Sequence, residues 1–169
     1  MKKVIIIVVA IFCMPFMAGA WGVLGHRIVG EVADHYLSAK ARKGIQQLLG
    51  NESIAMAANW ADFIKSDTSY NYLNNWHYVN LKSDLSRNEV FNFLDQQTGP
   101  NVYNRIDAMV AMLKDKRSTS EQKKFALRVL LHLVGDLHQP MHTARFEDLG
   151  GNRISLTWFG ERSNLHRVW

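Results

Sequence analysis

The chain has 169 residues, 47 % of them hydrophobic and 21 % charged, and its formal net charge is +5. This length suits one domain with a sizeable core, and the single cysteine excludes a disulfide-rich scaffold. The small positive charge favours a polyanionic partner only weakly, and no repeat, low-complexity tract or linker divides the sequence.

The first 20 residues have the pattern of a secretory signal peptide. Two lysines precede an apolar run over 4–12, and Ala18-Gly19-Ala20 forms a small-x-small cleavage site before Trp21. The apolar run is too short for a membrane anchor. We therefore expect cleavage after Ala20, a secreted or periplasmic location, and a mature domain over 21–169 that lacks cysteine and has a net charge of +3.

The mature chain is predicted to be mainly α-helical. Apolar residues recur at helical spacing over 27–49, and Gly50 follows the last of them. Ser53 is suited to cap a second helix, which we expect to run to about residue 65. Two residue pairs have the spacing of a capping box ahead of further helices: Ser86 with Glu89, and Ser118 with Glu121.

The longest predicted helix starts near Thr119. Its side chains over 125–137 are apolar on nearly every side, which predicts a central, buried helix that ends at Pro140. Beyond a turn at 150–152, the alternation of apolar residues over 154–158 predicts a strand of a short β-hairpin. Ser163 is then suited to cap a helix that contains His166, and the sequence stops within two turns, so we expect a domain truncated at its C-terminal end.

The run from His132 to His142 carries the strongest chemical signal. His132 and Asp136 are four residues apart and share one helix face, so an imidazole and a carboxylate can bind one cation. His142 follows Pro140 and can approach the same pocket from another direction. Burying these groups together without a metal would be costly. We expect His138 to pack or hydrogen-bond beside this site.

His26, Asp62 and His77 are further candidate ligands. Each has an ordinary alternative: His26 as an exposed residue near a terminus, Asp62 as a helix-surface carboxylate, and His77 within an aromatic cluster. The free amino group of Trp21 could also bind a metal. Nitrogen and oxygen ligands without thiolates favour zinc over an iron–sulfur cluster, and so many histidines argue against calcium or magnesium.

Taken together, these motifs resemble the S1/P1 nuclease family across the whole mature chain. The resemblance depends on Trp21, Gly25-His26, Trp60-Ala61-Asp62, Trp76-His77-Tyr78, the run 132–142, Gly150-Gly151-Asn152 and the segment 164–169. It implies a mostly helical fold, shared with zinc-dependent phospholipase C, and three zinc ions. Family members are single-strand-specific nucleases and 3′-nucleotidases.

The resemblance also implies how the ligands divide among three zinc sites. The first would take the amino group and carbonyl of Trp21 with His26 and Asp136. The second would take Asp62, His77, His132 and Asp136, so that Asp136 bridges the pair. The third would take His142, His166 and an aspartate that falls one position beyond this sequence.

The implied reaction is in-line attack of an activated water on phosphorus, leaving 5′-phosphate products. Asp62, Lys65 and Asp136 would be the catalytic residues. Lys65 stands where the family has a phosphate-binding arginine and supplies a point charge without a bidentate fork. Asn80 stands where fungal members have a base-binding aspartate, and Asn152 is a third candidate for substrate binding. Lys65 and Asn80 could equally be ordinary surface residues.

We therefore expect a secreted zinc enzyme that acts on single-stranded DNA and RNA and on 3′-nucleotides, without stable membrane association. A base would stack on an aromatic wall, for which Tyr72, Tyr78 and Trp158 are candidates. Two alternatives remain open: a zinc-dependent phospholipase C, and an exported zinc-binding module without catalysis. The Leu-His-x-Val-Trp motif at 165–169 favours the nuclease.

Overall fold

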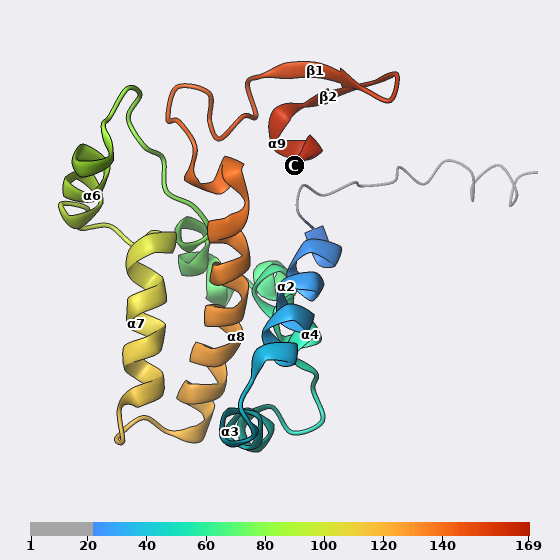
Figure 1. Ribbon diagram of the computed structural model, residues 1–169, viewed down its shortest axis with the longest axis vertical. Coiled ribbons are helices and arrows are strands. Elements are labelled where there is room, and N and C mark those ends of the chain that lie inside the picture. The colour runs from blue at the N-terminus through green and yellow to red at the C-terminus, as the bar shows by residue number, and fades with distance from the viewer. Residues whose placement is uncertain (1–21) are drawn as a thin grey trace, which may run out of the picture.

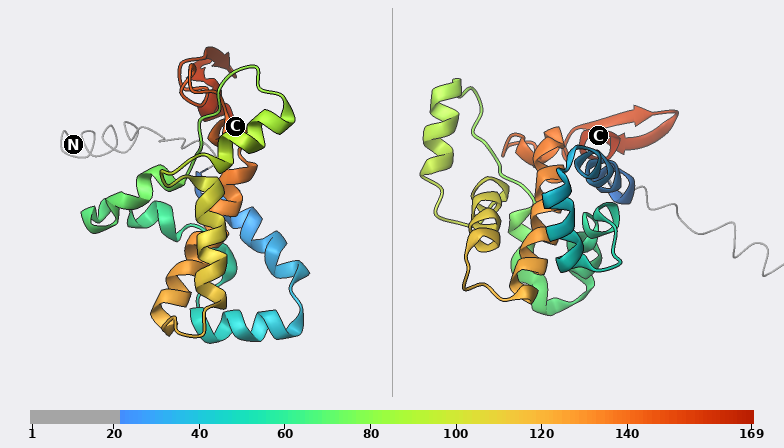
Figure 2. Two further views of the ribbon diagram at one scale, coloured as in Figure 1. Left: turned by 90° about the vertical axis from the view of Figure 1, so that its left-hand side faces the viewer. Right: turned by 60° about the horizontal axis from the view of Figure 1, so that its bottom comes forward.

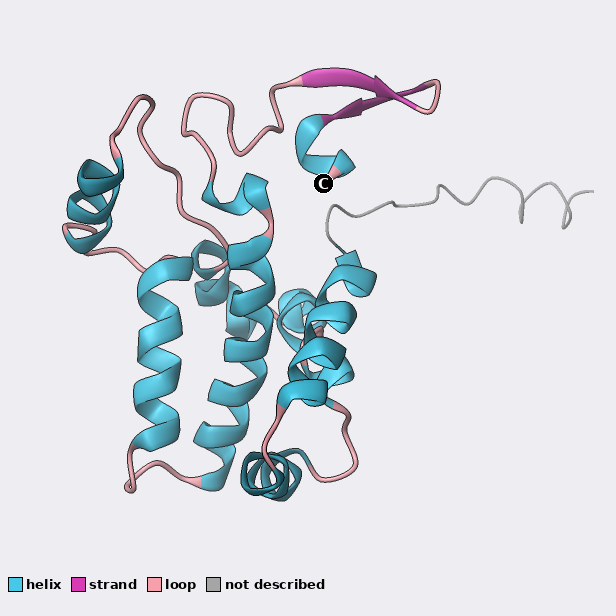
Figure 3. Ribbon diagram, in the orientation of Figure 1, coloured by secondary structure: helices cyan, strands magenta, loops and turns pink. Residues whose placement is uncertain are grey.

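The computed structural model describes residues 22–169 as a mainly helical domain with one β-hairpin (Figures 1 and 3), which confirms the predicted fold class. The predicted signal peptide and Trp21 lie outside the described residues. Within 22–169, no helix combines the length and hydropathy needed to cross a membrane.

The described residues form eight α-helices, three 3-10 helices (η) and one β-hairpin. Their bounds are α2 (Gly22–Tyr36), α3 (Ala39–Leu49), α4 (Ile54–Ala57), α5 (Trp60–Phe63), η1 (Ile64–Ser66), η2 (Thr68–Trp76), α6 (Arg87–Asp95), α7 (Val102–Lys114), α8 (Ser120–His138), η3 (Pro140–Thr143), β1 (Ser155–Trp158), β2 (Glu161–Asn164) and α9 (Leu165–Val168).

Helix α8 is the central element, as predicted. It packs along α7 on one side and against α2, α4 and α5 on the other (Figures 1 and 2). One hydrophobic cluster fills the α7–α8 interface and includes Met109, Val129 and Leu133, whereas a second joins Leu49 and Leu127. The hairpin, α9 and α6 all lie at the C-terminal end of α8 (Figure 1). This end therefore gathers segments that are far apart in the sequence.

The prediction of one continuous helix over 27–49 is wrong, because the structure has two helices there. The chain leaves the helix at Leu37, and Ser38 adopts an extended conformation in which its hydroxyl accepts a hydrogen bond from the Ala41 amide. A side chain that caps a new helix competes with continuation of the old one. The result is two helices, α2 and α3, joined by a sharp corner (Figure 1).

The second predicted helix is also interrupted. Ser53 caps it as expected, accepting a hydrogen bond from the Met56 amide, but α4 ends at Ala57 and the chain continues as α5 and η1. The fully buried Asn59 marks the break, and its side chain donates to the carbonyl of Ala55. This break gives α5 its own direction and turns Asp62 toward α8.

Three other helix starts show which capping predictions were confirmed and which were missed. Glu89 caps the backbone and hydroxyl of Ser86 at the start of α6, as predicted. Helix α7 has no counterpart in the sequence prediction, because its capping box pairs Asn101 with Asn104 rather than with an acidic residue. The capping box of α8 lies one residue later than predicted, with Thr119 and Gln122 in place of Ser118 and Glu121.

The segment after η2 runs beside the segment after α8. Val79 donates its amide to the carbonyl of His142 at 2.8 Å, and Leu81 donates to Ala144 at 2.9 Å. Farther on, β1 and β2 pair in antiparallel fashion from Ser155 opposite Asn164 to Trp158 opposite Glu161. The strand predicted over 154–158 is confirmed, whereas Asn164, not Ser163, caps α9.

We expect Gly30→Ala to destabilise the fold, because α2 and α4 cross closely at this glycine. A Cβ atom there would lie 2.6 Å from Ala55 Cα and 2.9 Å from Ala55 N, both backbone atoms that cannot swing aside. The expected loss is about 1–3 kcal/mol of unfolding free energy in urea titrations. Gly44→Ala in α3 is the matched control, since its Cβ would meet nothing within 4 Å. It should stabilise by about 0.5–1 kcal/mol, and equal effects of the two substitutions would contradict the close crossing.

Candidate metal centre

The predicted ligands converge on Asp136, near the C-terminal end of α8. Its side chain is 1 % exposed and is surrounded by imidazoles from four different elements. These come from α2 (His26), the residue after η2 (His77), α8 itself (His132) and η3 (His142). Pro140 ends the helix, as predicted, and the 3-10 turn that follows brings His142 back toward the site. A single buried carboxylate thus lies at the centre of the cluster.

Each carboxylate oxygen of Asp136 faces its own pair of rings. Oδ2 lies 2.9 Å from His77 Nδ1 and 3.2 Å from His132 Nε2, and these two nitrogens are 3.0 Å apart. Oδ1 lies 3.0 Å from His142 Nδ1 and 3.5 Å from His26 Nε2. The carboxylate therefore lies between two sets of nitrogen atoms.

Asp62 completes the cluster from α5. Its Oδ1 lies 3.7 Å from His132 Nε2, and its Oδ2 lies 3.8 Å from His26 Nε2. The rings of His26 and His132 stack with centroids 3.7 Å apart. Because His26 is 2 % exposed, the alternative of an exposed histidine near a terminus is wrong. Asp62 is also more than a surface carboxylate, since its side chain is only 30 % exposed and both oxygens face imidazoles.

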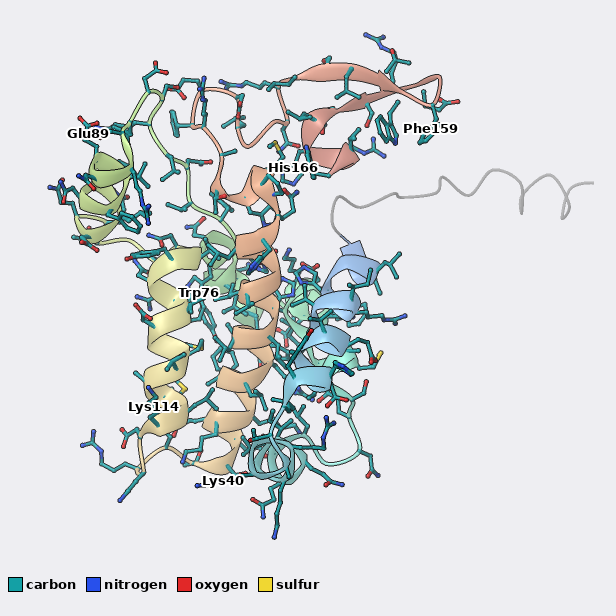
Figure 4. All side chains as sticks on the ribbon, viewed as in Figure 1. Lys40, Trp76, Glu89, Lys114, Phe159 and His166 are labelled. Atoms are coloured by element: carbon teal, nitrogen blue, oxygen red, sulfur yellow. The ribbon has the colours of Figure 1, made fainter. Side chains whose placement is uncertain are left out.

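His166 lies against His142. The two rings stack with centroids 5.2 Å apart and an interplanar angle of 20°. Figure 4 shows His166 between α9 and the C-terminal end of α8. His138, by contrast, is exposed on α8 and donates Nδ1–H to the carbonyl of Val134 at 2.7 Å, so it stays outside the cluster.

Backbone carbonyls orient two of the rings. His132 Nδ1 lies 2.8 Å from the carbonyl of Ala58, and His166 Nδ1 lies 2.8 Å from the carbonyl of Gly150. A carbonyl only accepts, so each Nδ1 carries a proton, and whenever the ring is neutral its Nε2 is a bare lone pair. Histidines that bind metals are held in this way, with the second ring nitrogen donating to a carbonyl or carboxylate.

Hydrogen bonds among the described residues leave part of the cluster unsatisfied. His26 Nδ1 and His77 Nε2 are buried without a hydrogen-bond partner among the described residues. Such atoms are rare in folded proteins because each costs free energy. The cluster is therefore arranged for something other than internal hydrogen bonding.

The spacing of the ligand atoms fits a divalent metal. Zinc–nitrogen bonds of about 2.0–2.1 Å place neighbouring ligands of a tetrahedral site about 3.3 Å apart. The nitrogen–oxygen separations around Asp62 and Asp136 run from 2.9 to 3.8 Å, on both sides of that value. Two groups could each hold an ion: His26 with Asp62 and His132, and His77 with His132 and Asp136.

Ionisation favours metal binding over proton binding at most of these ligands. Burial lowers the pKa of His26 to about 4, and burial likewise lowers the pKa of His77 and of His166 below the usual value. These rings are neutral at pH 7, as metal ligands must be. Burial would raise the pKa of Asp136, but hydrogen bonds from the surrounding histidines hold it well below its usual value.

His132 and Asp62 are more tightly linked to each other. Burial alone would lower the pKa of His132, yet its hydrogen bond to Asp136 and the nearby carboxylates raise it. Burial would raise the pKa of Asp62, and the charges of His132 and Lys65 lower it overall. A metal bound here would therefore compete with a proton at His132.

A cavity of about 490 Å³ opens beside the cluster. The three residues predicted to bind substrate all line it, namely Lys65, Asn80 and Asn152. The ammonium of Lys65 lies 2.5 Å from Asp62 Oδ1, which ties the cavity wall to the metal ligands. His77, His142 and His166 line the same cavity, so a ligand bound in it would touch the cluster.

Only one of the three candidate stacking residues lines this cavity. Tyr78 does so with 40 % of its surface exposed. Tyr72 instead stacks on Tyr70 and meets the edge of Trp76, and Trp158 contacts Phe159 at the end of the hairpin. Local aromatic spacing could not distinguish these positions in the sequence.

Gly135 is a requirement of the site that sequence reasoning missed. A Cβ atom at this position in α8 would lie 2.6 Å from His26 Nδ1. Only a glycine here lets the ring from α2 reach the face of α8 that bears His132 and Asp136. The available signal was a glycine within a long, otherwise apolar helix, where it costs helix stability and so indicates a packing or functional reason.

Comparison with known proteins gives a consistent result. Residues 21–169 match the family model described as S1/P1 Nuclease. Nuclease P1 of Penicillium citrinum is 31 % identical over 154 residues, covering 88 % of this chain and 56 % of the relative. Nuclease S1 of Aspergillus oryzae is 28 % identical, with coverages of 100 % and 60 %, and Endonuclease 2 of Arabidopsis thaliana is 30 % identical, with coverages of 98 % and 59 %. The chain thus spans under two thirds of the length of these relatives.

We expect Gly135→Ala to weaken metal binding without unfolding the domain, because the new methyl group displaces the ring of His26. Metal content per chain after dialysis against zinc should fall, while circular dichroism keeps its helical signal. Leu137→Ala, at an exposed position of the same helix, is the control and should keep its metal. Equal metal content in both variants would show that His26 is not held close to α8 by the absence of a side chain.

Removal of bound metal should lower thermal stability. A ligand at 100 times its dissociation constant stabilises the native state by about 2.7 kcal/mol. For a domain of this size, that corresponds to a drop of about 5–10 °C in Tm on chelation, measured by differential scanning calorimetry. Added zinc should restore the midpoint and magnesium should not, because the ligand atoms include several imidazoles. A midpoint that chelation leaves unchanged would contradict metal binding.

Proposed function

The chain belongs to the S1/P1 nuclease family, and from this membership we propose that the protein is a secreted zinc-dependent phosphodiesterase. It hydrolyses single-stranded DNA and RNA to 5′-phosphate products and removes phosphate from 3′-nucleotides. The observation that carries the proposal is the buried carboxylate of Asp136, placed between four imidazoles beside an open cavity.

The proposed metal complement is three zinc ions. One would be held by Trp21, His26 and Asp136, a second by Asp62, His77, His132 and Asp136, and a third by His142, His166 and a ligand beyond position 169. The two oxygens of Asp136 face different nitrogen atoms, which supports its role as a shared ligand. The stacked rings of His142 and His166 support a separate third site.

Zinc in this centre would supply an activated water near neutral pH and positive charge beside the phosphate. The residues of the chain do the rest. Ala58 and Gly150 fix two imidazole rings through their carbonyls, and Asp62 holds the ammonium of Lys65 at the cavity wall. There the ammonium serves as a point charge for a phosphate oxygen.

Selectivity for single strands follows from the depth of the centre. A phosphate reaches the buried ligands only if its nucleotide is splayed out of any duplex. The exposed ring of Tyr78 offers a stacking surface for that base, and stacking of this kind tolerates every base. Asn80 makes no side-chain hydrogen bond to any residue over 22–169, so its amide is available to the edge of the base as both donor and acceptor.

Export is part of the same proposal. Residues 1–20 would be removed after Ala20, which frees the amino group of Trp21 as a metal ligand. The family match begins at residue 21, in agreement with a mature domain that starts there. Cleavage of the leader and assembly of the metal centre would then be coupled, because the amino group does not exist in the precursor.

Substitution of the shared carboxylate tests the proposal. We expect Asp136→Asn to lower kcat/KM on single-stranded DNA by more than about 100-fold, since substitutions even beyond the direct ligands of a metal typically cost 10- to 100-fold. Asp107→Asn, an exposed carboxylate on α7, is the matched control and should keep full activity. The assay should compare single-stranded DNA, RNA, a 3′-nucleotide, duplex DNA and phosphatidylcholine. Hydrolysis of phosphatidylcholine alone would replace the nuclease with a phospholipase, and zinc binding without any hydrolysis would leave a binding module.

A further inference from the structure

A second cavity, of about 390 Å³, lies on the other side of Tyr78 and Asn80. We propose that it binds a second nucleoside of the single strand, adjacent to the nucleoside in the first cavity. This inference rests on the proposed nuclease function and extends it, because it makes the protein a reader of at least two successive nucleotides. The volume is within the range of about 300–1,000 Å³ of small-molecule pockets.

The two cavities share part of one wall. Tyr78 and Asn80 line both of them, whereas the remaining lining residues differ. The first cavity continues toward His142 and His166, and the second continues toward α6 and the start of α7. Hydrogen bonds from Val79 to His142 and from Leu81 to Ala144 hold this wall in place. A ligand in the first cavity and a ligand in the second cavity would therefore contact the same fixed wall. Two successive nucleosides of one strand could bind in this way.

The lining of the second cavity combines aromatic rings with carboxamides. Phe93 comes from α6, Phe146 from the segment after η3, and Tyr78 from the shared wall. Phe146 is 62 % exposed, which leaves its ring open to a stacking partner. Aromatic rings bind the faces of bases, and carboxamides bind their edges.

The carboxamides keep free hydrogen-bonding capacity. Gln97 donates through Nε2 to the carbonyl of Phe93, and no bond to its Oε1 is present among the described residues. Asn75 accepts from the Tyr78 hydroxyl through Oδ1, which leaves its amino group available. Asn101 is different, because its side chain caps α7 and binds Gly99. Gln97, Asn75 and Asn80 are therefore the groups that can read a base.

The uncharged, partly polar lining of the second cavity favours a nucleoside over an ionic or a purely apolar ligand. None of the described residues that line this cavity is acidic or basic. Lys82 stands just outside, with Nζ 5.7 Å from the centre of the Phe93 ring. A neutral base and sugar match the interior, and the charged phosphate groups of the strand would remain outside this cavity. A lipid chain would leave the carboxamides unpaired.

Comparison of two substrates tests the proposal. A 3′-mononucleotide fills only the first cavity, whereas a five-residue oligothymidylate reaches both. We expect Phe93→Ala and Gln97→Ala to raise KM for the oligonucleotide, by about 5- to 150-fold in the case of the lost stacking ring. KM for 3′-AMP should stay within twofold. Phe91→Ala is the matched control, because Phe91 is a 46 % exposed ring on the same helix that lines neither cavity.

The alternative outcomes are distinct. Unchanged KM values for both substrates, or equal changes for both, would overturn the second site. Phe146→Ala provides the same comparison at an exposed position if Phe93→Ala lowers the yield of folded protein. If the unaltered protein hydrolyses neither substrate, the proposed function fails, and the second site is then judged by fluorescence anisotropy of labelled oligothymidylate. Equal affinity of the unaltered protein and the Phe93→Ala and Phe146→Ala variants would overturn it in that case too.

Discussion

The burial of one carboxylate is the constraint on which the rest of the structure depends. Asp136 is almost fully removed from water, and an isolated buried carboxylate would be far too costly to remain ionised. Here the surrounding histidines hold the pKa of Asp136 well below its usual value, so the charge is retained. Burial lowers the pKa of two of those rings, His26 and His77, so neither supplies a proton charge to compensate the carboxylate at neutral pH. Metal ions would resolve this imbalance, since they supply charge without requiring a proton at each ring.

The fold meets this constraint by using α8 as a rigid platform. The α7–α8 interface packs Met109, Val129 and Leu133 on the side of α8 away from α2. Sites on well-packed helices hold their geometry better than sites on loops. His132 and Asp136 lie one turn apart on the same helix, and Gly135 beside them admits the ring from α2. The loops and short helices at the end of α8 then need only to deliver one side chain each.

Part of this arrangement was predictable from the sequence, because it is local. The helical spacing of His132 and Asp136, the stop at Pro140 and the cap at Ser53 depend on neighbouring residues only. The breaks at Ser38 and Asn59 were not predictable in the same way. A serine or asparagine within a helical pattern can either point to solvent or cap a new helix, and the packing of α2 against α4 and α8 decides which.

The candidate site shows the same division. No spacing rule brings His26, Asp62 and His77 to one carboxylate, since they are separated from Asp136 by 59 to 110 positions and meet only through tertiary packing. Family resemblance supplied that grouping. The residues that line the substrate cavity were predicted less completely. Tyr78 and Tyr72 have equivalent local sequence contexts. Tyr78 reaches the cavity because its segment, 78–81, runs beside 142–144.

The charge distribution of the two cavities indicates how a polyanion would be recognised. Apart from histidines, Lys65 is the only basic residue among the described residues that line either cavity, and its ammonium is already paired with Asp62. The net charge of the chain is also modest. Non-specific attraction by a basic surface is therefore weak, and most of the favourable electrostatic free energy must arise at the metal centre. Under the proposed function, the neutral walls would select for flexible, unstacked strands, and the buried centre would select for the phosphodiester.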